Sequence, residues 1–342
     1  MNLSGALLSL LNPEPAHQAS IWALKYGLGG HAAAPDPRIS IKIWGQTFPS
    51  PFGMAAGFDK QGQVMSPLLN LGLGFVEVGT ITPNPQSGNP RPRVFRAPKQ
   101  QAVINRYGFN SSGHDVVYAR LAAWRTKNPE AALGVNLGMN KTEKNPLHAY
   151  ISGIKLFEGL ASYLVINLSS PNTKGLRDQQ TEGLRDLIRG IKDAQTQGTP
   201  LLAKVAPDLD EDQIKFISQV AVEEEVDGLI ISNTTLDRPE NLPKKFSAQR
   251  GGLSGAPLRN KALLTLKRFY SEISEQIPLV GVGGIMSGLD AVERIKAGAT
   301  LIQSYTGIAF QGPDLIQEVN VAILKAMQQA GVTEVAKLRG MA

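Results

Sequence analysis

The chain contains no cysteine, which excludes disulfide bridges, thiolate nucleophiles, zinc fingers and cysteine-bound iron–sulfur clusters. Its only histidines are His17, His31, His114 and His148, and their spacing is not that of a metal site, so we expect no bound metal. No apolar run is long enough to span a bilayer, and the N-terminus resembles neither a secretory signal nor a transit peptide. These absences predict a protein that stays in the cytoplasm.

Basic residues outnumber acidic ones, 35 to 29, which gives a net charge of +6 and a pI near 9.4. This excess suits an anionic small molecule, an anionic membrane surface or nucleic acid, although a basic solvated surface would look the same. Aromatic residues make up only 6% of the chain, and no run of five or more basic residues occurs. We therefore expect no nucleic-acid partner.

Short apolar runs predict buried strands, and most are continuous, as in parallel strands covered on both faces. The runs are Pro51–Ala56, Phe75–Gly79, Leu133–Leu137, Tyr163–Leu168, Leu201–Val205, Gly228–Ser232, Leu279–Val282 and Thr300–Ser304. Helical patterns lie between them, for example at Ala149–Leu160, Gly183–Gln197, Asp210–Glu224, Asn260–Gln276 and Gly288–Ala297. This alternation predicts an α/β fold, a (β/α)8 TIM barrel. An open doubly wound sheet is the alternative, but no strand is followed by Gly-x-Gly-x-x-Gly.

Two connections, 80–115 and 233–259, are too long for simple βα loops. In a barrel such loops lie over the mouth formed by the carboxyl ends of the strands, where active sites form.

Residues 1–38 stand apart from the strand pattern and carry two short helical stripes, one from Leu3 to Leu11 and one from His17 to Leu28. We expect a two-helix N-terminal extension, followed by a barrel domain over residues 39–342. The extension either packs on the barrel or exposes an apolar surface to a membrane or a lipid-like ligand.

The predicted strands end in polar or glycine-rich residues, which a barrel gathers at one mouth. These are Asp59 and Lys60, Thr80, Asn136, Asn167 and Ser170, Lys204, Ser232 to Thr234, Gly283 and Gly284, and Tyr305 to Gly307. A lone asparagine here is usually a turn residue, but several amides with two lysines indicate a common functional site. The glycines after the last two strands are typical of a phosphate site, or of tight turns.

Two residues of this mouth carry the chemical hypotheses. Lys204 lies within an apolar strand, where it needs an electron-rich partner such as a reduced flavin, or acts as a Schiff-base nucleophile, unless it only reaches solvent. Ser170 is a candidate proton acceptor, or else a helix cap before Pro171. It lacks the Gly-x-Ser-x-Gly elbow of an acyl-transfer nucleophile.

Several motifs together resemble the class 2, quinone-dependent dihydroorotate dehydrogenases over nearly the whole chain. They are Pro13-Glu-Pro-Ala-His17, Ala55-Ala-Gly-Phe-Asp-Lys60, Glu77-Val-Gly-Thr-Ile-Thr-Pro83, Pro92-Arg-Val-Phe-Arg96, Asn105-Arg-Tyr-Gly-Phe-Asn110, Asn167-Leu-Ser-Ser-Pro-Asn-Thr173, Gly251–Gly255 and Gly281–Gly284. The resemblance implies a barrel that binds FMN and oxidises (S)-dihydroorotate to orotate in pyrimidine biosynthesis. Class 1 relatives use a cysteine base, so the absence of cysteine agrees with class 2.

The resemblance also assigns residues to ligands. It implies FMN contacts at Ala56, Gly57, Phe58, Asp59, Lys60, Thr80, Asn136, Asn167, Lys204, Ser232, Gly255, Gly284, Tyr305 and Thr306, although the family often has threonine in place of Ser232. It implies substrate contacts at Lys60, Asn105, Arg106, Tyr107, Gly108, Phe109, Asn167, Asn172, Asn233 and Thr234. Ser170 would be the base that removes the C5 proton, Thr173 would relay the proton, and Phe109 would shield the site.

A quinone would reoxidise the flavin in such a protein. The resemblance implies a quinone tunnel at His17, Arg96 and Tyr305, ubiquinone or menaquinone as acceptor, and peripheral contact with the cytoplasmic face of a bacterial inner membrane. No iron–sulfur partner subunit is expected.

Three alternatives remain open from the residues alone. They are another FMN barrel with a different small substrate, a Schiff-base lyase or aldolase that uses Lys204, and a membrane-binding scaffold with an inactive barrel.

Overall fold

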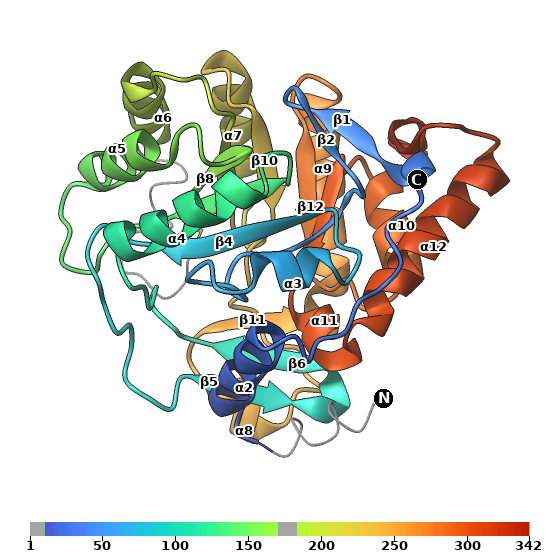
Figure 1. The fold of residues 1–342 in the computed structure, drawn as a ribbon, viewed down its shortest axis with the longest axis horizontal. Coiled ribbons are helices and arrows are strands. Elements are labelled where there is room, and N and C mark those ends of the chain that lie inside the picture. The colour runs from blue at the N-terminus through green and yellow to red at the C-terminus, as the bar shows by residue number, and fades with distance from the viewer. Residues whose placement is uncertain (1–10, 170–182, 342) are drawn as a thin grey trace.

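The computed structural model describes residues 11–169 and 183–341, and parallel strands close into an eight-stranded barrel at its centre (Figure 1). The barrel strands are β3 (Phe52–Met54), β4 (Phe75–Ile81), β7 (Leu133–Leu137), β8 (Tyr163–Asn167), β9 (Leu201–Val205), β10 (Gly228–Ile231), β12 (Leu279–Val282) and β13 (Leu301–Ser304). They pair in chain order, and β13 pairs with β3 to close the sheet. Each predicted run supplies one of these strands, so the TIM-barrel prediction is confirmed and the open sheet is excluded.

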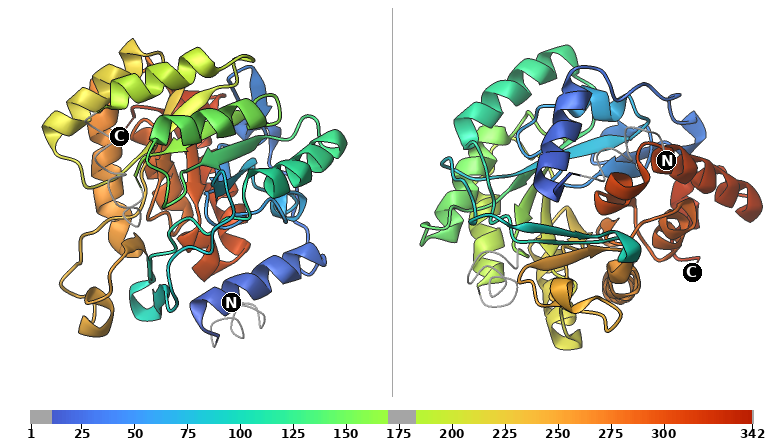
Figure 2. Two further views of the ribbon diagram at one scale, coloured as in Figure 1. Left: turned by 90° about the vertical axis from the view of Figure 1, so that its left-hand side faces the viewer. Right: turned by 90° about the horizontal axis from the view of Figure 1, so that it is seen from below.

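Helices surround the barrel (Figures 1 and 2). They are α3 (Met65–Leu69), α4 (His114–Lys127), α5 (Pro146–Phe157), α6 (Leu184–Ala194), α7 (Glu211–Glu223), α9 (Arg259–Ile273), α10 (Gly288–Lys296), α11 (Thr306–Gln311) and α12 (Asp314–Ala330). The five predicted helices all form, with ends shifted by a few residues. At the start of α7, for example, the Asp210 side chain accepts from the Gln213 amide N–H and the Gln213 side chain accepts from the Asp210 amide N–H, which is a capping box.

Aromatic rings fill the end of the barrel next to the hairpin of β1 (Ile41–Ile43) and β2 (Gln46–Phe48). Trp44 lies 5.4 Å from Tyr163 and Phe48 lies 5.4 Å from Phe75, measured between ring centroids. Gly134 makes room for this packing, because a Cβ there would lie 2.3 Å from the Tyr163 ring. The barrel therefore has an apolar floor, and its functional residues gather at the opposite end.

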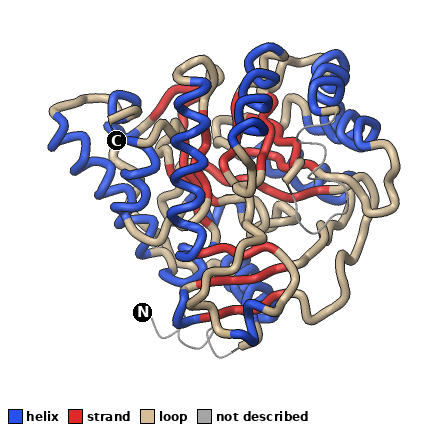
Figure 3. The backbone as a smooth tube through the Cα atoms, turned by 180° about the vertical axis from the view of Figure 1, so that it is seen from behind, coloured by secondary structure: helices blue, strands red, loops and turns tan. Residues whose placement is uncertain are grey.

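The two long connections fold together at that opposite end. They contribute β5 (Val94–Ala97), β6 (Ala102–Asn105) and β11 (Gly252–Gly255) to one antiparallel sheet, separate from the barrel, which we call the cap sheet (Figure 3). The short helix α8 (Lys244–Ser247) lies nearby (Figure 1). The sequence placed both connections over the mouth but did not predict their strands.

One N-terminal helix lies in the described part of the chain. This helix, α2 (Pro13–Lys25), buries Ala16, Ile21 and Leu24 against β5 and α3. The predicted helical stripe extends to Leu28, but α2 ends at Lys25, so Leu28 lies outside the helix, where it is 69% exposed. The other predicted helix falls almost entirely on residues 1–10, outside the described residues. None of the described helices has both the length and the apolar character needed to cross a membrane.

Candidate active site

A row of hydrogen-bonded side chains crosses the carboxyl ends of β4, β7 and β8. The Thr80 hydroxyl donates to Asn136 Oδ1 at 2.6 Å, and Asn167 Nδ2 donates to both Thr80 Oγ1, at 3.0 Å, and Asn136 Oδ1, at 3.2 Å. Asn233, which follows β10, donates to Asn167 Oδ1 at 3.4 Å and to Ser169 Oγ at 3.0 Å. Four predicted site residues therefore form one network, and we call them, together with Ser169, the amide row.

A buried ionic layer lies directly beneath the amide row. Glu77 is fully buried, and its Oε1 accepts from Asn136 Nδ2 at 2.8 Å. Its Oε2 accepts from Tyr163 OH at 3.2 Å and from Gln303 Nε2 at 2.7 Å. Lys204 Nζ lies 3.9 Å from Glu77 Oε1, which is an ion pair without the short contact of a hydrogen bond.

Lys204 fits an electron-rich ligand. Its side chain is only 6% exposed, and burial lowers the pKa of its ammonium group, while Glu77 opposes that shift. Because a buried ammonium needs compensating charge, a planar anionic group over the strand ends would stabilise it further. The site therefore has the donor chemistry expected for the negative edge of a reduced flavin.

The loop after β12 has the open backbone of an anion site. Gly283 and Gly284 have φ angles of 106° and 71°, and a Cβ at Gly284 would lie 2.3 Å from the Arg259 backbone. The buried Arg294 holds this loop, since its Nη2 donates to the Gly283 and Arg259 carbonyls at 2.8 and 2.6 Å. Such a glycine turn exposes amide groups to a phosphate.

The loop after β3 contains Ala56, Gly57, Phe58, Asp59 and Lys60. The Asp59 carboxylate accepts amide N–H groups of Gln63, at 2.9 Å, and Val64, at 2.7 Å, so it stabilises the loop itself. Lys60 Nζ donates to the Gly57 carbonyl at 2.5 Å and lies 4.3 Å from the centre of the Tyr107 ring. Desolvation lowers the pKa of Lys60 to about 8, so its charge is sensitive to mildly alkaline pH.

Other predicted site residues lie around the same mouth. The Ser232 hydroxyl donates to the Asn233 carbonyl at 3.1 Å, and the Thr306 hydroxyl donates to Ser254 Oγ at 2.9 Å. The remaining positions are Asn105 at the end of β6, Gly108 and Phe109 after it, Thr234 after β10, and Gly255 at the end of β11. Ser170, Asn172 and Thr173 lie outside the described residues.

Arg106 is a predicted substrate contact whose charge is used within the cap sheet. Its guanidinium donates to the Pro92 carbonyl at 2.8 Å and to the Arg250 carbonyl at 3.1 Å. Its backbone is used as well, because its N–H donates to the Arg93 carbonyl at 2.9 Å and its carbonyl accepts from Asn89 Nδ2 at 2.7 Å. The substrate contact predicted for Arg106 stays a prediction.

The three residues predicted for a quinone tunnel divide between two environments. His17, on α2, packs near Phe58 and Tyr305, with ring centroids 5.4 and 6.2 Å away. Arg96, on β5, donates to the Leu11 carbonyl at 2.8 Å. The tunnel assignment itself stays a prediction.

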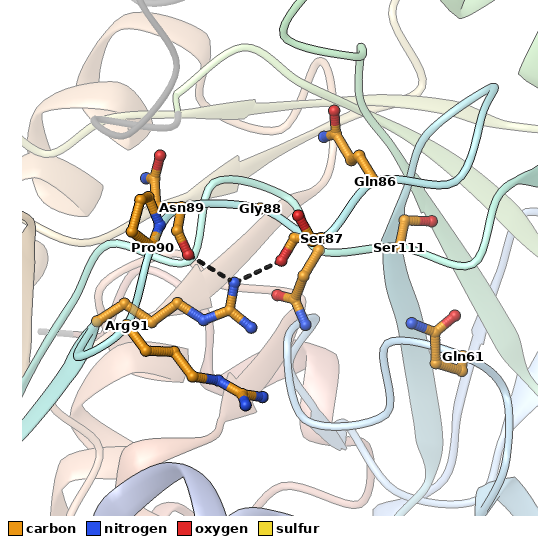
Figure 4. Close-up of a pocket in the computed structure, with 10 residues that line it drawn as sticks. Gln61, Gln86, Ser87, Gly88, Asn89, Pro90, Arg91 and Ser111 are labelled. Carbon is orange, nitrogen blue, oxygen red and sulfur yellow. Dashed lines mark hydrogen bonds between the residues drawn. The ribbon is translucent and has the colours of Figure 1, made fainter.

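A separate cavity of about 630 Å³ opens beside the loop 86–91 (Figure 4). It is lined by Gln61, Gln86, Ser87, Gly88, Asn89, Pro90, Arg91, Arg93, Asn110 and Ser111. Arg93 Nη1 donates to the Ser87 and Asn89 carbonyls at 2.5 and 3.0 Å. The lining includes neither Lys204 nor the amide row, so we do not place the chemistry there.

Comparison with known proteins assigns the family. Residues 38–327 match the family model described as dihydroorotate dehydrogenase. The chain belongs to this family. A relative from Parvibaculum lavamentivorans, named dihydroorotate dehydrogenase (quinone), is 46% identical over 96% of this chain and 94% of its own length. The mouse relative, named dihydroorotate dehydrogenase (quinone), mitochondrial, is 43% identical over 99% of this chain and 89% of its own.

A solved structure agrees with this assignment. The crystal structure of an Eimeria tenella dihydroorotate dehydrogenase in complex with ferulenol superposes with a TM-score of 0.92. It is 40% identical in sequence and covers 96% of this chain and 95% of its own. Membership in this family removes support for the lyase and scaffold alternatives.

The ionic layer around Glu77 was not predicted from the sequence. Glu77 and Gln303 lie inside the apolar runs of β4 and β13, and Tyr163 begins β8. The signal was present, because a charged or amide residue in a buried strand needs a partner just as Lys204 does. Within the Glu77–Pro83 motif, nothing distinguishes Glu77 as a buried residue. Its hydrogen-bond partners come from other strands that are distant in sequence.

His17 gives a prediction about acid stability. Desolvation lowers the pKa of the half-buried His17 to about 3, from 6.5, so between those pH values the unfolded chain binds a proton that the folded chain does not. We expect the free energy of unfolding to fall as pH falls below about 6.5, with this residue contributing up to about 1.4 kcal/mol per pH unit. His17→Gln should flatten that slope in urea denaturation measured between pH 4 and 7.

The exposed His31 provides the control, and His31→Gln should leave the slope unchanged. His114, whose pKa burial lowers to about 4, should retain part of the slope in the His17 variant. An identical slope in the wild type and His17→Gln would contradict this account.

Proposed function

We propose that this protein oxidises (S)-dihydroorotate to orotate and passes the electrons to a membrane quinone in pyrimidine biosynthesis. The observation that carries the proposal is the amide row above a buried lysine, in a chain that is 46% identical to a curated dihydroorotate dehydrogenase (quinone). Aligned amides suit a planar ligand with alternating C=O and N–H groups. A ligand without those groups would leave buried amides unpaired and would bind poorly.

FMN is the cofactor that the donor groups fit. Lys204 would face the electron-rich edge of its ring, Thr80, Asn136 and Asn167 would offer polar groups beside it, and the loop at Gly284 would hold its phosphate. Bound FMN supplies a hydride acceptor that a quinone can reoxidise. The buried cation and the glycine loop support this cofactor independently of each other.

The chain supplies binding, orientation and proton transfer for the reaction. Lys60 would hold the substrate carboxylate, while Asn167 and Asn233 would bind the edge of the pyrimidine ring. Ser170 would accept the C5 proton as hydride leaves C6, and Thr173 would pass that proton on. Phe109 packs against Met139 and Ala149, so its ring is fixed where it would exclude water.

The hydrogen bond of His17 restricts its role toward a quinone. His17 Nε2 lies 2.8 Å from the Phe58 carbonyl, which can only accept, so Nε2 carries the proton. With the pKa lowered to about 3, the ring is neutral and its Nδ1 is left as an acceptor. His17 would therefore accept a hydrogen bond from a quinol hydroxyl, whereas Arg96 would donate to a quinone carbonyl.

An exposed aromatic pair at the C-terminal end of α2 supports peripheral membrane binding. Trp22 and Tyr26 are 57% and 64% exposed, with ring centroids 4.7 Å apart. Amphipathic rings of this kind bind at the boundary between headgroups and acyl chains. We infer that α2 contacts the quinone-containing membrane, which in a bacterium would be the cytoplasmic face of the inner membrane.

The first prediction for this function concerns Ser170. Ser170→Ala should slow anaerobic flavin reduction by dihydroorotate at least about a hundredfold, because general bases contribute at least that much. FMN content, measured from the flavin absorbance per protein, should stay equal to that of the wild type. Reduction at the normal rate in this variant would eliminate Ser170 as the base.

The second prediction uses the pKa of Lys60. Its ammonium form binds an anion and is lost as pH rises through the pKa of about 8, so orotate affinity should fall above that pH. In Lys60→Arg the fall should move beyond pH 10, since a guanidinium stays protonated. The measurement is the orotate dissociation constant from flavin absorbance between pH 6 and 10. An affinity independent of pH in the wild type would argue against this contact.

The third prediction concerns the aromatic pair. Trp22→Ser with Tyr26→Ser should weaken binding to anionic lipid vesicles at least about tenfold, because each buried ring contributes about 1.5–3 kcal/mol. Turnover with a short-chain, water-soluble quinone should be unchanged. Tyr118→Ser, on α4, removes a ring that is 37% exposed and should have no effect on vesicle binding. Equal vesicle binding by all three proteins would refute the membrane contact.

A further inference from the structure

Glu77 occupies an unusual position for an acidic residue. Its side chain has no solvent exposure, and it comes from β4, below the residues that meet the ligands. We propose that Glu77 is a positioning residue, which fixes the amide orientation of Asn136, supports the rest of the amide row through it, and holds the charge of Lys204. The proposal rests on the function and cofactor proposed above, and it assigns no ligand contact to Glu77.

The argument begins with the chemistry of a carboxylate, which accepts hydrogen bonds and cannot donate them. Glu77 Oε1 lies 2.8 Å from the Asn136 amide, so Asn136 must turn its NH₂ group toward Glu77. Its Oδ1 is then fixed on the other side. There it accepts from the Thr80 hydroxyl at 2.6 Å and from Asn167 Nδ2 at 3.2 Å.

The same reasoning fixes the next amides. Because the Asn167 NH₂ group faces Asn136 and Thr80, its Oδ1 faces Ser169 and Asn233. Asn233 Nδ2 accordingly points back to Asn167 Oδ1 and Ser169 Oγ. Its own Oδ1 accepts from the Thr234 amide N–H at 2.8 Å. The buried carboxylate therefore fixes Asn136, and the row continues in the same direction. The backbone N–H groups of Ser169, at 3.4 Å from Asn167 Oδ1, and of Thr234 hold the other two amides in that direction as well.

This orientation matters for specificity. An asparagine whose amide can rotate presents a donor or an acceptor at the same point, and so distinguishes poorly between a C=O and an N–H group on a ligand. Glu77 removes that freedom in the protein before the ligand binds. A site whose polar groups are fixed in advance rejects ligands with the opposite pattern, because their groups would be left unpaired.

The second contact of Glu77 is with Lys204. The carboxylate lies 3.9 Å from Nζ and forms an ion pair with this lysine inside the barrel. Both Asn136 and Lys204 are residues that we expect to meet FMN. Glu77 therefore supports two ligand contacts from behind, without reaching the mouth itself.

The test compares Glu77→Gln with Glu158→Gln. A glutamine in place of Glu77 keeps the shape of the side chain but can present either a donor or an acceptor to Asn136. Glu158 is also buried, at 5% exposure, but it accepts from Thr196 and Gln197, in the connection from α6 to β9. The measurements are the FMN dissociation constant of the apoprotein by fluorescence and the orotate dissociation constant of the FMN-loaded protein by absorbance.

We expect Glu77→Gln to weaken FMN binding and orotate binding each roughly tenfold, since a hydrogen bond to a charged group is replaced by a neutral one. Glu158→Gln should change neither constant by more than about twofold. Normal affinities for both ligands in Glu77→Gln would overturn the proposal. A wild-type protein that binds no FMN would instead overturn the proposed function.

Two further variants separate orientation from packing, and the first of them, Tyr163→Phe, does not depend on Glu77→Gln folding. Tyr163→Phe removes a donor to Glu77 but leaves the carboxylate, so orotate binding should stay within about twofold of the wild type. The double variant, Glu77→Gln with Asn136→Asp, moves the carboxylate from position 77 to position 136. There it still accepts from Thr80 and Asn167, so orotate binding should recover to within about threefold of the wild type. A tenfold loss in Tyr163→Phe, or no recovery in the double variant, would indicate a packing role only.

Discussion

The burial of opposite charges inside a closed barrel is the constraint on which this site depends. Glu77 and Lys204 lie in strands that are covered on both faces, where an unpartnered charge would be strongly unfavourable. The carboxylate is compensated by hydrogen bonds that Asn136, Tyr163 and Gln303 donate to it. The carboxylate in turn fixes Asn136, and the proposed ligand would meet an amide row whose orientation is already set.

Barrel closure supplies the geometry for this chemistry. The apolar floor around Phe75 and Tyr163 fills one end, so polar strand residues can share only the other. There the two long connections form the cap sheet, and α2 packs against its edge strand β5. Glu14 of α2 ties these parts together, since its carboxylate pairs with Arg91 and Arg93 at 3.0 and 2.8 Å. The candidate quinone residues are thereby held next to the loop that contains Lys60.

Much of the fold could be predicted from the sequence. Strands of a parallel sheet are buried on both faces, so they appear in the sequence as continuous apolar runs. The runs also placed Thr80, Asn136, Asn167 and Lys204 at one mouth, and the structure brings them together. The cap strands were not predictable, since β5, β6 and β11 are short, and β11 pairs with a segment about 150 residues away in sequence. Glu77 was missed for a related reason: its partners come from β7, β8, β9 and β13, and only the closed sheet brings them near.

The most direct test is an anaerobic absorbance titration of the purified protein. The account predicts a flavin absorbance that bleaches on adding dihydroorotate and returns on adding a quinone. The first change reports reduction of the flavin by the substrate, and the second reports its reoxidation by the quinone. A flavin that other substrates reduce but dihydroorotate does not would contradict the proposed substrate. Correctly folded protein that binds no FMN, even after reconstitution, would contradict the account as a whole.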